Sequence, residues 1–166
     1  AKETLRAQVD VREEISKLLL RKEEKENFLA ELKNLLQNFQ KTFGIIVHFP
    51  DYEEKLLINF EPTTEVQLLR IVQEVLTNIR KHAQATSVEI RLTSDTESTL
   101  LLIEDNGIGF EVNNLSAKTH SYGLGIISER AKEFHGSVTV ESTPGKGTRI
   151  FVSIPKKRRE YESITS

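Results

Sequence analysis

The segment 65–85 constrains the fold of this chain more than any other, because its apolar residues occupy most of a helical circumference. Three polar residues, Glu74, Asn78 and His82, recur at every fourth position, so they form one narrow stripe along the predicted helix. Such a stripe either faces water or lines a cleft, and the segment alone is compatible with both. The apolar residues are Val66, Leu68, Leu69, Ile71, Val72, Val75, Leu76 and Ile79.

The apolar patterns around this segment alternate between the periods of helices and of strands. Their order predicts an α/β two-layer sandwich, in which helices cover one face of a mixed, mainly antiparallel sheet. The run 99–103 is continuously apolar, which indicates a strand buried on both faces. Gly44 and Gly136 each follow a helical pattern and are expected to end it. We expect helices over 1–20, 28–43 and 62–85, and a fourth helix that starts at the glycines of SYGLGI (121–126) and ends at Gly136. The expected strands are 45–49, 55–60, 88–92, 99–103, 137–141 and 148–154.

Composition narrows the functional classes. The chain has 166 residues, no cysteine and a formal net charge of −2. The missing cysteines exclude disulfides and thiolate zinc sites and fit a reducing compartment, so we expect a cytoplasmic domain. No apolar run approaches the roughly 20 residues of a membrane-spanning helix. The negative charge argues against broad nucleic-acid binding, and the basic run 156–159 is expected to be a solvated tail.

The polar stripe carries groups suited to phosphate chemistry. Asn78 offers a neutral oxygen to a hard cation such as Mg²⁺, and Glu74 can accept a proton or orient a nucleophile. Lys81 can reach a phosphate as a point charge. His82 can do the same, or form only a local hydrogen bond.

Two glycine pairs follow the predicted strand 99–103. In EDNGIGF (104–110), Asp105 can accept a hydrogen bond from an amine of a flat ligand, although Asp-Asn-Gly is also a common turn. In SYGLGI (121–126), the glycines stand at a predicted helix start, which either binds an anion or is simply a flexible entry. The connection 110–122 is long enough for a lid. A third glycine pair, in 144–148, reads as a hairpin turn before Thr148.

Together these motifs resemble a known family. QEVLTNIRKHA (73–83), EDNGIGF (104–110), YGLGIISERA (122–131) and GSVTVESTPGKGTRIFVSIP (136–155) resemble, in this order, the ATP-binding catalytic domain of sensor histidine kinases. That domain has the Bergerat fold and belongs to the GHKL superfamily, which includes DNA gyrase B, Hsp90 and MutL. The forms NxxKHA and YGLxxISERA are most similar to the subfamily of DesK-, NarX- and LiaS-like sensors.

The resemblance implies a role for each motif residue. It places Mg²⁺ on Asn78, beside the ATP phosphates, and gives Glu74 the task of orienting or deprotonating the attacking group. Asp105 would accept the hydrogen bond from the adenine amino group. The remaining implied ATP-binding residues are Lys81 and His82 near the phosphates, Gly107 and Gly109 around adenine, Gly123, Leu124 and Gly125 at the lid hinge, and Thr148 supporting adenine.

The resemblance also implies an organisation and partners. Residues 1–22 are expected to end a dimerisation domain, 23–156 to form the catalytic domain and 157–166 a tail. None of the four histidines has the setting of a phosphoacceptor, so we expect this chain to be part of a longer protein whose acceptor helix lies elsewhere. That parent is expected to be a homodimer that passes the phosphoryl group to a response regulator, and a membrane anchor in the parent is compatible with this expectation.

Three alternatives stay open at this point. The same fold serves serine kinases of the anti-sigma-factor type and other GHKL ATPases. A third alternative is a regulatory module that binds ATP without catalysis. The lead-in helix and the NxxKHA form argue against the first two, and the presence of both Glu74 and Asn78 argues against the third.

Overall fold

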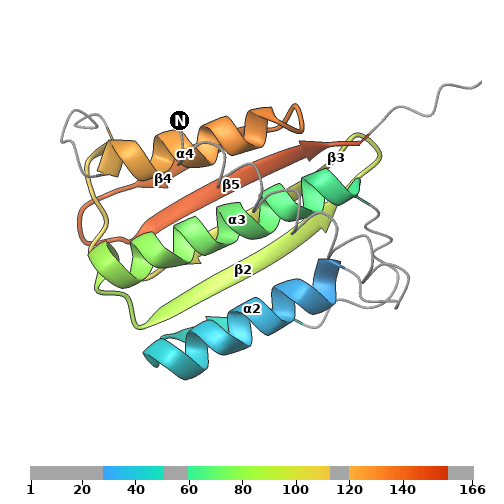
Figure 1. Ribbon diagram of the computed structural model, residues 1–166. Helices are drawn as coiled ribbons and strands as arrows, with labels where there is room; N and C mark the ends of the chain where they lie inside the picture. Colours follow the sequence, from blue (N-terminus) through green and yellow to red (C-terminus); the bar gives the residue numbers. More distant parts are fainter. Residues whose placement is uncertain (1–27, 51–59, 113–119, 157–166) are drawn as a thin grey trace, which may run out of the picture.

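The computed structural model describes residues 28–50, 60–112 and 120–156. It is a two-layer α/β sandwich in which the helices lie on one face of a sheet (Figure 1), and this confirms the predicted fold class. The predicted helix 1–20 and residues 55–59 of one predicted strand lie outside the described residues. The elements are α2 (Phe28–Phe43), β1 (Ile46–His48), α3 (Pro62–Asn78), the π-helical turn η1 (Ile79–Ala83), β2 (Ser87–Ser94), β3 (Ser98–Asp105), α4 (His120–Lys132), β4 (Ser137–Ser142) and β5 (Thr148–Pro155).

The sheet has the strand order β1-β2-β3-β5-β4. β1 is parallel to β2, and the other neighbours are antiparallel, so the sheet is mixed and mainly antiparallel, as predicted. The register aligns Asp105, the last residue of β3, with Val88 on one side and Thr148 on the other, and Thr148 in turn with Ser142. These four residues therefore form one row across the end of the sheet.

The hydrophobic core fills the space between the helices and the inner face of the sheet. Along β3, Leu101 and Ile103 are fully buried at 0% and 1% exposure, whereas Leu100 and Leu102 on the opposite face are only partly buried. The prediction that 99–103 is buried on both faces is therefore wrong. Its apolar outer residues lie on the face that no described helix covers (Figure 1).

Helix α3 begins at Pro62, as predicted, because a fixed φ and a missing N–H suit the first helical position. Its α-helical part ends at Asn78, earlier than the predicted end near residue 85, and the chain continues as η1. Gln84 closes this turn in the left-handed conformation, with φ of 51°. A π-helical turn adds one residue to the hydrogen-bonded ring, and such turns are common at functional sites.

The other two described helices differ in how they end. Gly44 ends α2 with a φ of 69°, and its N–H donates to the Gln40 carbonyl at 2.9 Å, as expected for a helix-ending glycine. After α4, however, the left-handed residue is His135, with φ of 58°, and not the predicted Gly136. Position 136 needs glycine for another reason, because a Cβ there would lie 2.5 Å from the Ser153 carbonyl oxygen.

Within the described ranges, no helix has both the length and the apolar character that a membrane crossing requires.

Candidate functional site

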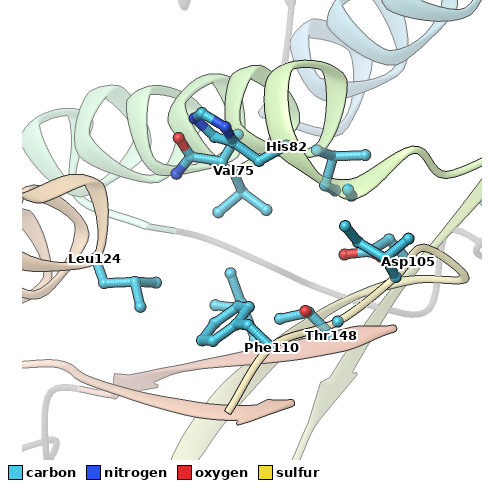
Figure 2. A pocket seen from close by; sticks show the side chains of 12 residues that line it. Val75, His82, Asp105, Phe110, Leu124 and Thr148 are labelled. Carbon is cyan, nitrogen blue, oxygen red and sulfur yellow. The ribbon is translucent and has the colours of Figure 1, made fainter. Parts of the chain in front are cut away.

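A cavity that is partly open to solvent lies between α3 and the end of the sheet where β3 stops and β5 begins. Four polar side chains line it, from Asn78, His82, Asp105 and Thr148. Figure 2 shows the helix carrying His82 on the side opposite Asp105 and Thr148. The other lining residues are Val75, Ile79, Ala83, Ile108, Gly109, Phe110, Leu124 and Ile150.

Asp105 is the buried acid of this cavity, with 5% of its surface exposed. Its Oδ1 accepts a hydrogen bond from the Gly107 N–H at 2.8 Å. Burial raises the pKa of its carboxyl group, while the backbone N–H groups of Gly107 and Thr148 act in the opposite direction. The residue therefore presents a desolvated hydrogen-bond acceptor beside an apolar surface.

The two glycines after Asp105 allow the loop to approach the protein's own backbone. A Cβ at Gly107 would lie 2.2 Å from the Ala83 carbonyl oxygen, and the next N–H, of Ile108, donates to that same oxygen at 2.7 Å. Gly109 has a φ of 62°, and a Cβ there would lie 2.1 Å from the Thr143 carbonyl oxygen. Gly109 lines the cavity, whereas Gly107 fastens the loop to the end of η1.

The β4–β5 turn, predicted only as a hairpin, supports this loop from the other side. The Gly145 N–H donates to the Ile108 carbonyl at 2.6 Å. Gly147 has a φ of 77°, and a Cβ there would lie 2.0 Å from the Asp105 carbonyl oxygen. The segments 105–110 and 143–148, which are distant in sequence, are thus packed backbone to backbone.

Asn78, Glu74 and Gly123 meet at the α4 side of the cavity. A Cβ at Gly123 would lie 2.8 Å from Asn78 Nδ2 and 3.3 Å from Glu74 Oε1. Asn78 lines the cavity itself. Glu74 instead lines a neighbouring hollow between α2 and α3, together with Arg70 and Arg80. The glutamate therefore stands beside the cavity and not in it.

Other predicted site residues lie apart from the cavity. Lys81 is exposed and does not line it, whereas the exposed His82 does. Gly123 and Gly125 do not stand at the start of a helix as predicted, because α4 already begins at His120. Gly125 is exposed, and no atom lies within 4 Å of a Cβ placed on it. Residues 113–119, the centre of the predicted lid, lie outside the described residues.

Sequence reasoning missed the apolar wall of the cavity. Val75 and Ile79 were expected to be core residues, and Phe110 and Ile150 carried no functional signal. Spacing offered one clue, since Val75 and Ile79 are four residues apart, beside the polar stripe. Ser142 was missed as well, although its hydroxyl joins the Phe110 N–H to the last strand.

The residues around the cavity fit a magnesium ion only if most of its ligands come from water and from the phosphates of a nucleotide. In the described part of the chain, no group of three or more His, Cys, Asp or Glu residues gathers to hold a metal ion. Asn78 supplies one neutral oxygen at the cavity wall. That fits Mg²⁺, which keeps several waters and takes its other ligands from the phosphates of a bound nucleotide.

Comparisons with known proteins all indicate one family. A family model for histidine kinase-, DNA gyrase B- and HSP90-like ATPases matches residues 63–158. The histidine-protein kinase/phosphatase DegS of Brevibacillus brevis is 33% identical over 127 residues, and the sensor histidine kinase LiaS of Bacillus subtilis is 36% identical over 124 residues. The alignments cover 76% and 75% of this chain but 32% and 33% of these relatives, so the chain spans about one third of their length.

Solved structures show the same fold. A histidine kinase domain from Erythrobacter litoralis EL346 superposes with a TM-score of 0.64 at 21% identity, over 77% of this chain and 60% of that one. The ATP binding domain of PrrB from Mycobacterium tuberculosis gives a TM-score of 0.61 at 22% identity, over 75% of this chain and 90% of that one. At these identities the likeness is one of fold.

Proposed function

Because this chain belongs to the family of histidine kinase-, DNA gyrase B- and HSP90-like ATPases, we propose that its cavity binds the adenine ring of ATP. One observation carries the proposal: Asp105 is 5% exposed, yet it lines a cavity whose other walls are largely apolar. Apolar walls suit a flat ring, and a desolvated carboxylate in such a place is stabilised by a donor such as the adenine amino group. Thr148, its neighbour in the same row, supports the same edge of the ring.

The phosphates are proposed to extend from the cavity towards Asn78 and Gly123 of α4. The close approach of Gly123 to Asn78 supports this direction, because it places the Asn78 amide, a group suited to a phosphate-bound cation, at the α4 side of the cavity. Leu124 covers the cavity on that side. Lys81 and Gly125 stay in the proposed site through the family resemblance alone, since neither lines the cavity.

Mg²⁺ is proposed to bind between Asn78 and the nucleotide phosphates. The single amide oxygen at the cavity wall supports this assignment. When bound, the ion neutralises the charge that develops on the phosphates. The contribution of the chain itself is to orient the nucleotide: Asp105 at the base and Asn78 at the phosphates hold its two ends.

The reaction is proposed to be transfer of the γ-phosphoryl group to a histidine. The bond from the γ-phosphorus to the ADP oxygen breaks, a bond from that phosphorus to an imidazole nitrogen forms, and ADP leaves. Glu74 is proposed to accept the imidazole proton or to hold the ring in line. Its position beside Asn78 and Gly123, at the rim of the cavity, supports this role.

The whole protein is proposed to be a two-component sensor kinase. Relatives that are sensor histidine kinases of about three times the aligned length support this. In this proposal residues 1–22 end a dimerisation domain, 23–156 form the catalytic domain and 157–166 a tail. Its partners are the phosphoacceptor helix of the same or the partner subunit and a response regulator, and it acts in the cytoplasm, where ATP is available.

The chemical stability of the product tests this proposal. The chain is mixed with γ-labelled ATP, Mg²⁺ and a dimerisation-domain fragment of a related kinase that carries the acceptor histidine. We expect a labelled fragment whose phosphoryl group is lost in acid and kept in base. An acid-stable label would indicate a serine kinase instead. Tight ATP binding without any transfer would indicate a regulatory module.

A further inference from the structure

The hydroxyl of Ser142 joins three segments beneath the cavity. The Phe110 N–H donates to Ser142 Oγ at 2.9 Å, and Ser142 Oγ donates to the Gly147 carbonyl at 3.0 Å. Ser142 Oγ also lies 2.8 Å from Thr148 Oγ1. Both Phe110 and Thr148 line the cavity, whereas Ser142 lies behind them and does not.

These contacts determine which hydroxyl donates to which. An amide N–H can only donate and a carbonyl oxygen can only accept, so the single hydrogen of Ser142 is used by Gly147. Thr148 must then donate to Ser142 in their mutual contact. The hydroxyl hydrogen of Thr148 therefore points away from the cavity, and its oxygen offers only lone pairs to a ligand.

We infer that Ser142 is a positioning residue for base specificity: it holds Thr148 as a hydrogen-bond acceptor, so that the cavity takes a purine with an amino group and rejects one with a keto group at the same position. Asp105 and Thr148 lie side by side in one row of the sheet, and both then present acceptors. An amino group brings two donors to this pair. A keto oxygen in the same place would face two acceptors and stay unpaired, so a base whose only donor on this edge is its N1–H makes fewer hydrogen bonds in this pose.

This inference rests on the proposed function, because it assumes that a purine nucleotide occupies the cavity. It differs from that proposal in making a prediction about selectivity. In the Ser142→Ala variant the Thr148 hydroxyl loses its acceptor and becomes free to turn into the cavity. It can then donate to a keto oxygen, so the preference for the amino form decreases.

The test measures the dissociation constants of ADP and of inosine diphosphate, which carries a keto oxygen in place of the amino group and a hydrogen on N1. Titration calorimetry is done on the wild-type chain, Ser142→Ala, Ser142→Thr and Ser137→Ala. We expect the ratio of the two constants to decrease by about threefold to tenfold in Ser142→Ala, the range of one neutral hydrogen bond. Ser142→Thr keeps the hydroxyl and should keep the ratio. Ser137→Ala is the matched control, since Ser137 is exposed at the other end of β4.

The outcomes separate the two proposals. A wild-type chain that binds neither nucleotide overturns the proposed function. A wild-type chain that prefers ADP, with the same preference in Ser142→Ala, overturns the role of Ser142 and leaves the proposed function standing. If Ser142→Ala does not fold, Ser142→Cys serves in its place with the same expectation, because a thiol is a weak hydrogen-bonding group.

Discussion

Asp105 and Thr148 are partners across two antiparallel strands, and the backbone N–H of Thr148 acts to lower the pKa of the Asp105 carboxyl group. The pairing brings a buried acid and a hydroxyl to the same wall of one cavity. Because β5 lies between β3 and β4, the geometry of this cavity wall depends on the sheet and not on a loop alone. Several expectations for binding and stability come from this arrangement.

Asp105→Asn is expected to weaken ADP binding by about tenfold to a hundredfold, the range for a hydrogen bond to a charged group. Titration calorimetry measures the loss. Asp95→Asn is the matched control, because Asp95 also accepts a hydrogen bond from the N–H two residues on, at 2.8 Å, but in the turn between β2 and β3. Equal effects of both variants would remove Asp105 from the site.

The stability of the ligand-free chain should carry a pH signature of Asp105. Burial raises its pKa above the ordinary value of 3.8, although the backbone N–H groups of Gly107 and Thr148 act to lower it. The native carboxyl group therefore keeps its proton where the unfolded chain has released it, so its stabilising contribution is lost as the pH rises through the native pKa. Urea titrations at several pH values should show the wild-type free energy of unfolding falling relative to Asp105→Asn. A relative rise with pH would contradict the raised pKa.

Substitution of two glycines by alanine should have opposite effects on stability. Gly107→Ala places a Cβ 2.2 Å from the Ala83 carbonyl oxygen, which is a rigid backbone atom. We therefore expect the free energy of unfolding to fall by about 1–3 kcal/mol. Gly125→Ala meets no atom within 4 Å and lies inside α4, so a gain of roughly 0.5–1 kcal/mol is expected. Thermal and urea unfolding measure both. Stabilisation by Gly107→Ala would show that the loop does not approach η1 in this way.

Asn78→Ala is expected to abolish the effect of Mg²⁺ on nucleotide affinity. ADP binding is measured with Mg²⁺ and with a chelator, and the ratio of the two constants should fall towards one in the variant. Asn34→Ala, an exposed asparagine of α2, is the control and should keep the wild-type ratio. An unchanged ratio in Asn78→Ala would mean that Mg²⁺ binding does not depend on this residue.

Gln67 should prove important for holding α4 against α3. It is 8% exposed, donates to Glu133 Oε2 at 2.6 Å and accepts from Arg130 Nη1 at 3.2 Å. Gln67→Leu leaves Glu133 and Arg130 without this hydrogen-bonding partner. We expect the free energy of unfolding, measured in urea, to fall by about 1–3 kcal/mol. Gln73→Leu, on the exposed side of the same helix, is the control and should change stability little.

Periodicity predicted most of the elements correctly. The apolar spacing of 28–43 matches α2, and the strands 88–92, 99–103, 137–141 and 148–154 were each found with slightly wider bounds. The start of α4 was missed because residues 120–122 carry no apolar pattern, so the glycines at 123 and 125 were taken for its first turn. Periodicity reports which residues are buried against the protein, and it carries less information where a helix begins outside the core.

The site residues that belong to a chemical motif could be predicted from the sequence. Those whose place depends on how the chain packs could not. Asn78, Asp105 and Thr148 were expected and line one cavity. The apolar spacing does not reveal the π-helical turn η1. It also does not reveal that Glu74 lies beside the cavity and not in it. Ser142 is one of many serines in the chain, and only the register of β4 with β5 reveals its place behind Thr148.

The backbone contact between 105–110 and 143–148 also bears on the synthesis of this protein. A ribosome completes β3 more than forty residues before it reaches β5. Until that last hairpin has emerged and paired, the nascent chain has Asp105 but lacks the turn and the threonine that complete the wall around it. If the cavity binds the nucleotide as proposed, a growing chain acquires this property only after β5 has been made and has paired, and a chain stopped before residue 148 is expected to lack it.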